Sequence, residues 1–429
     1  MDTHYKQADA LATSGRLDEA ESVCQVGLSL VPQDARLRSL LATIFQRKGK
    51  LPDAAAAYEL SLRGDPANAV AQYNLGLIRH QEGRPEDAER CFREAVRLNP
   101  RYFKAHNNLG SLLLEKRQYA AASASYRQAL RLVPDSLEVL LNLSSTLGKE
   151  GKRKEAVECA KRAVDLDRNN VKALTRYGTA LNEAEDNKRA VTVFRRILKL
   201  DPNSAAAKFF LASQGHAPMP SSMPKEIIQS LFDGYADNFD QHLVSGLHYQ
   251  VPAMLYGAVL QAVGDKEAKL RILDLGCGTG MCGVQFRHVA SHLVGVDLAP
   301  KMIAKSRERG VYDELLLDDI SVPLRAPGAA YDLILAGDVF IYVGELAEVF
   351  RDCRRVLAPG GLFAFSVEAA KPGESIVLHS EQRYAHSPEY LRSLAREVGL
   401  EELRMDEIVV RMGKGEPIKG YLAMFRNPP

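Results

Sequence analysis

The feature that most constrains this chain is a period of 34 residues that starts at its first residue. Six alanines recur at that interval without a gap: Ala20, Ala54, Ala88, Ala122, Ala156 and Ala190. A second phase holds Gly15, Gly49, Gly83 and Gly151, with Arg117 and Glu185 as exceptions, and a third holds Pro32, Pro66, Pro100, Pro134 and Pro202, broken by Arg168. A period of this length indicates stacked supersecondary units that bury one continuous core between neighbours. The period predicts six units: 1–34, 35–68, 69–102, 103–136, 137–170 and 171–204.

The spacing inside each unit predicts two helices joined by a turn. The turn falls on the repeated glycine, which adopts positive φ without a steric penalty, and proline ends the unit because it cannot continue a helix. The first half of each unit carries a small residue where two helices approach closely: Ala8, Ala42, Gly76, Gly110, Ser144 and Gly178. This pattern resembles the tetratricopeptide repeat (TPR), although the chain has no Trp at the position where that repeat often has one. The resemblance implies an all-α superhelix over residues 1–213, closed by a capping helix at 205–213.

Three asparagines share one phase of successive units: Asn74, Asn108 and Asn142. The resemblance places them on the first helix of each unit, which lines the concave surface, and the row is similar to the asparagine ladder of the O-GlcNAc transferase superhelix. An amide offers both a donor and an acceptor to a peptide backbone. The row therefore favours an extended peptide or protein as partner of the array. The alternative is that these asparagines only pack within the repeats. Leu40 and Arg176 interrupt the row on either side.

A stiff linker separates the repeats from the rest of the chain. Residues 214–224 hold three prolines with Gly and Ser, a composition that extends the backbone. The predicted domains are 1–213, a linker at 214–224, and a second domain at 225–429. After two helices (225–239 and 251–263), strand and helix patterns alternate to the end, which predicts a mostly parallel sheet covered on both faces. The last two strands, 402–411 and 420–425, have no helix between them, so one of them must run antiparallel.

A glycine-rich turn follows the first strand, Arg271–Leu275, and opens a helix. A turn of this kind lets a ligand approach the backbone at the carboxyl end of a sheet. A dinucleotide fingerprint would need a third glycine at the position of Met281, whereas the observed spacing puts glycines at 276, 278 and 280 with an acid two residues earlier. This spacing, with Tyr331-Asp-Leu-Ile-Leu and Leu357-Ala-Pro-Gly-Gly further on, resembles the class I methyltransferases that use S-adenosylmethionine. The resemblance covers residues 225–426 and implies a Rossmann-like, seven-stranded, mostly parallel sheet.

The resemblance also implies which residues bind the cofactor. The glycine-rich turn contributes its backbone, an acid after the second strand accepts hydrogen bonds from both ribose hydroxyls, and an acid after the third strand lies near the adenine amine. In this sequence the implied residues are Asp274, Gly276, Cys277, Gly278 and Gly280 in the turn, Asp297 with Leu298, Asp319 with Ile320, and Gly337 after the fourth strand.

Three segments are candidates for the acceptor side. Tyr235 lies ahead of the sheet, where related methyltransferases place a Tyr over the methionine end of the cofactor; the alternative is packing on the sheet. Asp338 and Tyr342 follow the fourth strand and by position face the transferred methyl group. The third segment, Arg383, Tyr384, His386 and Ser387, offers groups that bind a carboxylate or phosphate, with His386 as a general base. The alternative for Ser387 is an N-cap of the helix that starts at Pro388.

Composition narrows the function further. No apolar run is long enough to span a bilayer and the N-terminus resembles no signal peptide, so we expect a cytoplasmic protein without a membrane partner. The six cysteines are scattered without a CxxC pair, so no metal site is expected. Residues 216–429 hold 22 Lys and Arg against 28 Asp and Glu, which disfavours nucleic acid as a substrate.

Three functions remain open at this stage. The first is methylation of a peptide or protein that the repeats deliver. The second is methylation of a small-molecule acid or natural-product intermediate, with the repeats serving docking or homo-oligomerisation. The third is a scaffold whose second domain binds the cofactor only as a sensor.

Overall fold

A computed structural model describes residues 2–429 except 235, 237, 238, 242, 244, 245, 265–268, 329 and 414. The chain divides into two compact units, Met1–Asp201 and Pro202–Pro429.

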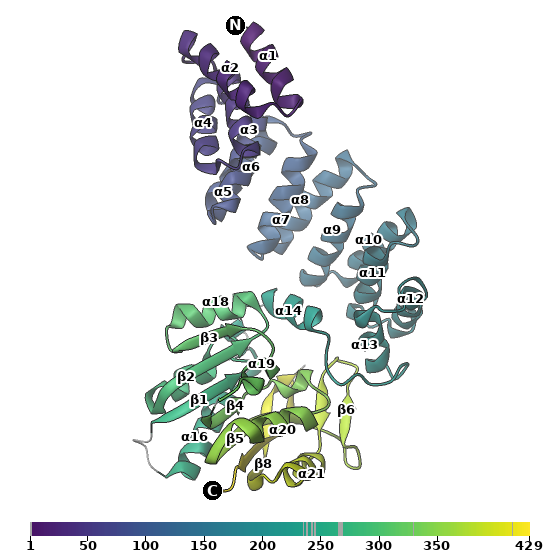
Figure 1. Ribbon diagram of the computed structural model, residues 1–429. Helices are drawn as coiled ribbons and strands as arrows, with labels where there is room; N and C mark the ends of the chain where they lie inside the picture. Colours follow the sequence, from purple (N-terminus) through teal and green to yellow (C-terminus); the bar gives the residue numbers. More distant parts are fainter. Residues whose placement is uncertain are drawn as a thin grey trace. The chain divides into compact units, whose positions relative to one another are not determined.

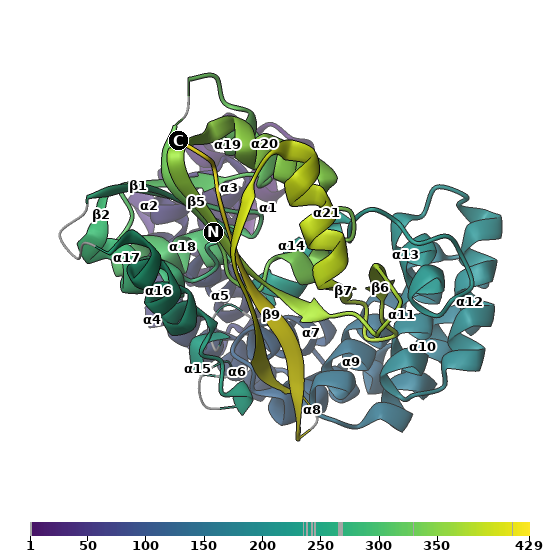
Figure 2. The same cartoon turned by 90° about the horizontal axis from the view of Figure 1, so that it is seen from below.

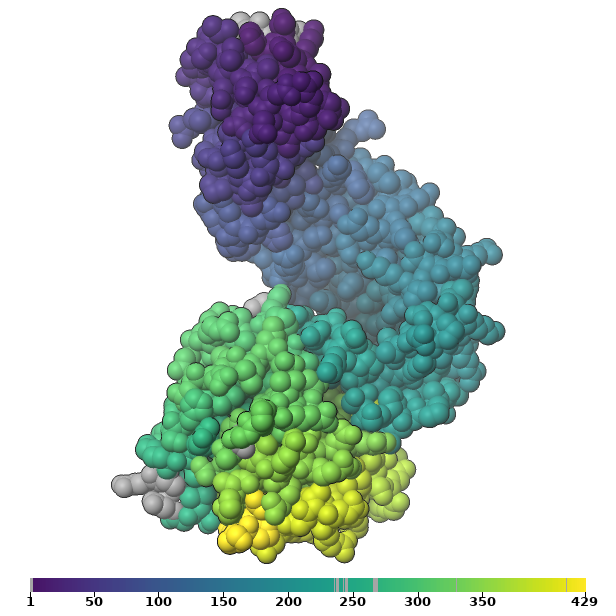
Figure 3. Space-filling model, in the orientation of Figure 1, coloured from purple at the N-terminus to yellow at the C-terminus, as the bar shows by residue number. Residues whose placement is uncertain are grey.

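The first unit is the predicted all-α repeat array (Figure 1). Within the part of it that the structure describes, each 34-residue unit forms an antiparallel helix pair. The helices are α1 (Asp2–Thr13), α2 (Leu17–Leu30), α3 (Ala35–Arg47), α4 (Leu51–Gly64), α5 (Ala69–Gln81), α6 (Pro85–Leu98), α7 (Phe103–Glu115), α8 (Tyr119–Leu132), α9 (Leu137–Lys149), α10 (Arg153–Leu166), α11 (Val171–Glu183) and α12 (Asn187–Leu200). In space-filling form these units follow one another without a break along the array (Figure 3). The bounds of these helix pairs fall within the six predicted units.

The turn between the paired helices requires positive φ in every unit. The four repeated glycines have φ between +71° and +85°, as predicted. The two exceptions in sequence are not exceptions in conformation, because Arg117 and Glu185 also adopt positive φ, +57° and +64°. Stacking of the repeats therefore imposes the turn even where the residue does not favour it.

The small residue in the first helix of each unit is needed for helix contact. A Cβ added at Gly76 would lie 2.7 Å from the ring of Phe92, and one added at Gly178 would lie 2.7 Å from the ring of Phe194. Gly110 faces Tyr126 at 2.8 Å in the same way. The aromatic ring of the second helix thus occupies the space that the glycine leaves free, which explains the spacing of the motif.

The second unit starts with α13 (Ala205–Ser213), which we expected as the cap of the array and which groups here with the sheet domain. Its helices are α14 (Lys225–Asp233), α15 (Phe239–Gln241), α16 (Val251–Val263), α17 (Met281–Phe286), α18 (Pro300–Arg309), α19 (Ser321–Arg325), α20 (Ala347–Val356) and α21 (Pro388–Val398). Its strands are β1 (Leu270–Leu275), β2 (Ala290–Asp297), β3 (Glu314–Leu317), β4 (Tyr331–Ala336), β5 (Leu357–Ala369), β6 (Ile376–Leu378), β7 (Tyr384–His386), β8 (Glu401–Gly413) and β9 (Glu416–Arg426). The predicted helix at 225–239 is too long, because α14 ends at Asp233.

The strands form one mixed sheet with the order β3-β2-β1-β4-β5-β7-β6. Strands β1 to β5 pair in parallel, and β9 pairs antiparallel with both β5 and β8. Over the residues that the structure describes the sheet has nine strands, so the expected number of seven is wrong. The additional pair is β6 and β7: β7 pairs in parallel with β5, and β6 pairs antiparallel with β7.

Apolar side chains cover both faces of the sheet, as a parallel sheet requires. Leu273 and Leu275 of β1 pack with α20 and α21, whereas Ile272 points to the other face and packs with α16 and α17. The long β8–β9 hairpin continues beyond its pairing with β5 (Figure 2). No helix among the described residues is long and apolar enough to cross a membrane.

Candidate active site

The turn after β1 is built from glycines that no other residue replaces easily. Gly276, Gly278 and Gly280 have φ of +63°, +54° and +91°. A Cβ at Gly276 would lie 2.6 Å from Val339, and one at Gly280 would lie 2.8 Å from the Ser306 hydroxyl. A Cβ at Gly278, by contrast, would meet only atoms at 3.9 Å or more, so this backbone borders open space. The turn thus presents bare backbone to the adjoining cavity.

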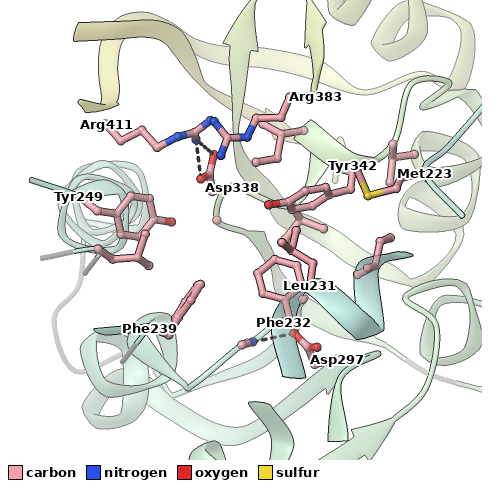
Figure 4. A pocket seen from close by; sticks show the side chains of 18 of the residues that line it. Met223, Leu231, Phe232, Phe239, Tyr249, Asp297, Asp338, Tyr342, Arg383 and Arg411 are labelled. Atoms are coloured by element: carbon pink, nitrogen blue, oxygen red, sulfur yellow. Dashed lines mark hydrogen bonds and ion pairs between the residues drawn. The ribbon is translucent and has the colours of Figure 1, made fainter. Parts of the chain in front are cut away.

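Asp297, at the end of β2, has both carboxylate oxygens hydrogen-bonded, and one of them bonds to this turn. Its Oδ2 accepts the backbone N–H of Gly278 at 2.9 Å and its Oδ1 accepts the N–H of Ala299 at 2.8 Å. Burial raises the pKa of Asp297, while these backbone N–H groups act in the opposite direction. Each oxygen keeps a second lone pair, so a fixed pair of acceptors faces the cavity (Figure 4).

Asp274 supports the turn from beneath and does not line the cavity. It is fully buried and accepts the Tyr312 hydroxyl at 2.6 Å. Burial raises the pKa of Asp274 to about 7, and the charge of Asp297 adds to the rise while the Tyr312 hydrogen bond opposes it. We predicted Asp274 as a direct cofactor ligand; its side chain lies outside the cavity lining and is bonded to Tyr312. Gly280 likewise lies outside the cavity lining.

The carboxyl edge of the parallel strands opens into a cavity of about 780 Å³. Pockets that hold a cofactor or a drug-sized ligand typically measure about 300–1,000 Å³. One end contains most of the residues predicted for the cofactor: Gly276, Cys277, Gly278, Asp297, Leu298, Asp319, Ile320 and Gly337. The other end contains Asp338, Tyr342 and Arg383 of the predicted acceptor side.

Asp319 lies at the same end of the cavity as Asp297, with its charge balanced by a neighbour. Its Oδ1 accepts the N–H of Ser321 at 2.9 Å and its Oδ2 lies 3.0 Å from Lys225 Nζ. Burial alone would raise the pKa of Asp319, but the hydrogen bonds from Ser321 and the charge of Lys225 lower it overall. Asp319 therefore presents an ionised acceptor.

A buried ion cluster forms the other end of the cavity. Arg411 of β8 donates from one nitrogen to both carboxylate oxygens of Asp338, at 2.9 and 2.7 Å, and from the other nitrogen to Glu368 of β5. The Arg411 side chain is only 2% exposed. Asp338 adopts a φ of +60°, and its own N–H donates to the Ser366 hydroxyl at 2.8 Å. The strained backbone turns this carboxylate toward Arg411 (Figure 4).

Two tyrosines border the ion cluster. Burial raises the pKa of Tyr342 to about 12, and the charge of Asp338 adds to the rise. Burial also raises the pKa of Tyr249 well above its usual value. Both side chains therefore hold their protons at neutral pH and face the cavity as hydrogen-bonding phenols (Figure 4).

The predicted segment at 383–387 divides between cavity and core. Arg383 lines the cavity, and the described residues provide it with no ion-pair partner within salt-bridge distance. Ser387 caps α21 by accepting the N–H of Tyr390 at 3.1 Å, which matches the alternative interpretation. Tyr384 is fully buried and donates to the carbonyl of Pro220 at 2.8 Å.

His386 does not lie where a general base would act. It is fully buried, does not line the cavity, and its Nε2 lies 2.9 Å from the carbonyl oxygen of Gly344. Burial lowers the pKa of His386 to about 4. The prediction of His386 as a general base is wrong, because a side chain buried in the core cannot reach an acceptor in the cavity. Tyr235, the other predicted aromatic, falls outside the described residues.

The asparagine row has contacts inside the array. Asn74 donates to the hydroxyl of Tyr58 at 2.9 Å, and Asn108 donates to the hydroxyl of Tyr73 at 2.9 Å. All three asparagines, Asn142 included, are partly exposed. Each of the two bonded amides retains a carbonyl oxygen and one N–H, so packing and peptide contact are compatible at these positions.

Sequence reasoning missed the partners of Asp338 and much of the apolar wall. Glu368 is a lone charge near the end of an apolar, buried strand, and this was the signal available for it. Strand β8 carries several other charges and is largely exposed, so its sequence did not single out Arg411. Further wall residues come from the linker, the hairpin tip and α14–α16: Ser222, Met223, Ile228, Leu231, Tyr249, Met412 and Ile418.

Comparison with known proteins finds two kinds of family model along the chain. A methyltransferase-domain model matches residues 273–365, and tetratricopeptide-repeat models match 1–25, 39–89, 81–136 and 141–205. The malonyl-[acyl-carrier protein] O-methyltransferase of Serratia marcescens is 32% identical over 147 residues, which are 34% of this chain and 54% of that protein. The ubiquinone biosynthesis O-methyltransferase of Bordetella bronchiseptica is 30% identical over 178 residues, which are 37% of this chain and 73% of that protein.

The chain thus spans about half the length of the first of these relatives. Among solved structures, pilF of Pseudomonas aeruginosa is 23% identical to this chain and superposes with a TM-score of 0.41. The alignment covers 49% of this chain and 96% of the pilF chain.

Proposed function

The chain belongs to the class I methyltransferases, here joined to tetratricopeptide repeats, and we propose that it transfers a methyl group from S-adenosylmethionine to an oxygen nucleophile of a small acceptor. The observation that carries this proposal is one continuous cavity, with the glycine-rich turn and Asp297 at one end and the Arg411 cluster at the other. Two relatives of different pathways, both named as O-methyltransferases, support oxygen as the accepting atom.

The cofactor end fits S-adenosylmethionine. The backbone at Gly278 leaves room where a Cβ would project, Asp297 offers two acceptors for vicinal hydroxyls, and Asp319 offers one for an exocyclic amine. When bound, this cofactor supplies a methyl group already activated by a sulfonium. The residues at this end therefore bind and orient, and they need no proton of their own.

The acceptor end must align the nucleophile, exclude water and take up a proton where the acceptor is a hydroxyl. The apolar side chains of Met223, Met412 and Ile418 exclude water, and the phenols of Tyr342 and Tyr249 orient a polar group. Glu368 is our candidate for the proton acceptor. It lies in the cavity wall, and burial raises its pKa while the charge of Arg411 opposes the rise.

Arg383 favours an acceptor that itself carries a carboxylate or phosphate. It is the cavity-lining guanidinium without a salt-bridge partner among the described residues, whereas Arg411 is held by two carboxylates. We expect an Arg383→Ala variant to raise the KM for such an acceptor more than it lowers kcat, because Arg383 anchors the substrate and takes no part in the displacement.

The proposal is tested first by calorimetric titration with S-adenosylmethionine and S-adenosylhomocysteine. We expect saturable binding that Asp297→Ala weakens by about 1.5–3 kcal/mol, the value of hydrogen bonds to a charged group. Asp406→Ala is the matched control, because it removes the same charge from a half-exposed site of an ion pair on β8. No binding by the intact protein would contradict the proposal and favour a scaffold. Binding without turnover on any acceptor would favour the sensor.

The repeat array supports a second candidate, in which the acceptor is a peptide or protein. Repeats of this kind are typical protein-interaction modules, and they occupy nearly half of the chain. Changing Asn74, Asn108 and Asn142 together to Ala separates the two candidates. Loss of turnover with unchanged cofactor affinity supports peptide delivery, and unchanged turnover supports the small acceptor. Tyr58 and Tyr73 lose a hydrogen-bond donor in this variant, so its thermal stability is measured alongside.

A further inference from the structure

The segment before α14 is part of the cavity as well as a connection between domains. Residues 202–224 belong to the second compact unit, and Ser222 and Met223 line the cavity together with Lys225. We call residues 220–223 the strap. Figure 4 places Met223 beside Tyr342, at the acceptor end.

The strap pairs with the loop that follows β4 as an additional strand would. The N–H of Met223 donates to the carbonyl of Tyr342 at 2.9 Å, and Ser222 forms an antiparallel bridge with Val343. The carbonyl of Ser221 accepts the N–H of Gly344 at 2.8 Å and that of Glu345 at 3.0 Å. The loop that carries the Tyr342 phenol is therefore held in place by the strap.

Tyr384 anchors the strap from the other side. Its hydroxyl donates to the carbonyl of Pro220 at 2.8 Å, and its ring packs 6.2 Å from the ring of Phe209 on α13, centre to centre. The same ring lies against Gly344, where an added Cβ would come within 2.5 Å. Phe209, Met223 and Tyr384 form one buried cluster. The residue before Tyr384 in the chain is Arg383, which lines the cavity.

The cofactor side of the same segment has separate anchors. Lys225 pairs with Asp319 at 3.0 Å, and the Gln229 amide donates to the carbonyl of Leu298 at 3.1 Å. The carboxylate of Asp233 accepts the N–H of Lys301 at 3.1 Å. Release of the strap would therefore leave α14 attached beside the cofactor.

We propose that the strap positions the acceptor end of the cavity and that Tyr384 is the positioning residue that holds it there. This inference rests on the proposed function, because the acceptor end is defined by it. It also assigns a place to Tyr384, a residue whose burial excludes direct contact with substrate. The consequence is that residues 205–224 are needed for a competent acceptor site, even though they precede the sheet.

The test uses the full chain with Tyr384→Phe, which removes the hydroxyl and keeps the ring packed on Phe209. Amide hydrogen exchange is followed by mass spectrometry on peptides covering 218–226 and 340–348. Loss of one hydrogen bond should accelerate exchange of Met223, Gly344 and Glu345 by about 2- to 12-fold. The thermal transition should fall by only about 1–6 °C, the shift expected for one hydrogen bond, and the exchange of β5 and β9 should rise less than that of the strap, because a positioning role is local.

Tyr390→Phe is the matched control. The Tyr390 hydroxyl accepts the N–H of Leu346 at 2.9 Å, so its loss disturbs the far end of the same loop. In Tyr390→Phe, amide exchange should accelerate in the peptide covering 340–348 and not in the peptide covering 218–226. If Tyr384→Phe gives no acceleration in 218–226, or an equal acceleration across the sheet, the inference is wrong.

Titration with S-adenosylhomocysteine separates this inference from the proposed function. The affinity of Tyr384→Phe should stay within about twofold of the unchanged protein, because the cofactor side has its own anchors. A loss above about tenfold would overturn the assignment of the strap to the acceptor end. Absence of binding in the unchanged protein would contradict the proposed function while leaving the exchange result interpretable.

Discussion

Replacing Arg411 by Met should destabilise the second unit far more than loss of an ordinary ion pair does. The substitution keeps the length of the apolar stem but leaves Asp338 and Glu368 facing each other, with side chains only 15% and 9% exposed. Removing one partner of a buried ion pair typically costs about 3–5 kcal/mol, because the remaining charge stays buried without compensation. For a unit the size of Pro202–Pro429, this lowers the melting temperature by about 6–20 °C.

The stability that Arg411→Met loses relative to the unchanged protein, called the deficit below, depends on pH in a definite direction. The charge of Arg411 opposes the rise that burial imposes on the pKa of Glu368, so its removal raises that pKa further. A carboxyl whose pKa is higher in the folded state than in the unfolded chain binds more protons in the folded state at a pH between the two values. The free energy of unfolding therefore falls as the pH rises from the lower pKa to the higher one. The deficit of Arg411→Met should therefore be small near pH 4 and largest above neutrality.

The assay is scanning calorimetry of the full chain, in which the transition that S-adenosylhomocysteine shifts upward identifies the second unit. Arg392→Met is the control, because it breaks an ion pair with Glu402 whose side chains are 43% and 32% exposed. Such a pair contributes about 0–1 kcal/mol. A melting temperature of Arg411→Met close to that of Arg392→Met, or a deficit independent of pH, would refute the reasoning.

Three further predictions concern stability. Asp274→Asn should become increasingly more stable than the unchanged chain from about pH 4 to pH 7, because the pKa of Asp274 is raised to about 7 and its ionisation opposes folding across that interval. Urea denaturation at several pH values measures the difference in the free energy of unfolding. A difference that does not change with pH would contradict the prediction. His386→Asn should lower the melting temperature, because it loses a buried hydrogen bond at a cost of about 1–3 kcal/mol. In the unchanged protein, the NMR signal of His386 should show no titration above about pH 5. A titration near pH 6.5 would argue for an exposed ring. Gly76→Ala should destabilise the array by about 1–3 kcal/mol, because the added Cβ would overlap Phe92. Gly257→Ala is the control: this glycine lies on a helix with nothing within 4 Å of an added Cβ, so the variant should stabilise the second unit by about 0.5–1 kcal/mol. Equal effects of the two variants in thermal scans would disprove the packing argument.

The features that were predictable from sequence are those fixed by contacts close in the chain. The repeat turns and the small residues beneath the aromatic rings depend on residues within about one supersecondary unit, and the glycine-rich turn was recognised from the spacing of its own residues. Spacing along the chain therefore reports them directly. Even Arg117, which breaks the glycine phase, adopts the left-handed conformation of its unit, so the period predicted the geometry better than the residue did.

The ion cluster and the strap were not predictable in this way. Arg411 lies 73 positions from Asp338 and 43 from Glu368, and its pairing with them depends on β9 placing β8 alongside the rest of the sheet. Tyr384 and Pro220 are 164 positions apart. His386 was chosen as a base from its residue type and its neighbours, whereas its role depends on burial, which the local sequence does not encode.

The two ends of the cavity therefore differ in how they are built, and this bears on where acceptor selectivity resides. The cofactor end comes mainly from consecutive strands β1 to β3 and the turns that follow them, so changing it disturbs the sheet. The acceptor end is assembled from the strap, the loop after β4, the segment at 379–383 and the β8–β9 hairpin, which contact one another largely through side chains and single hydrogen bonds. Substitutions at Met223, Met412 or Ile418 change the shape of this end without touching the glycine-rich turn. A change of acceptor by such substitutions, with cofactor affinity retained, is the result that this division predicts.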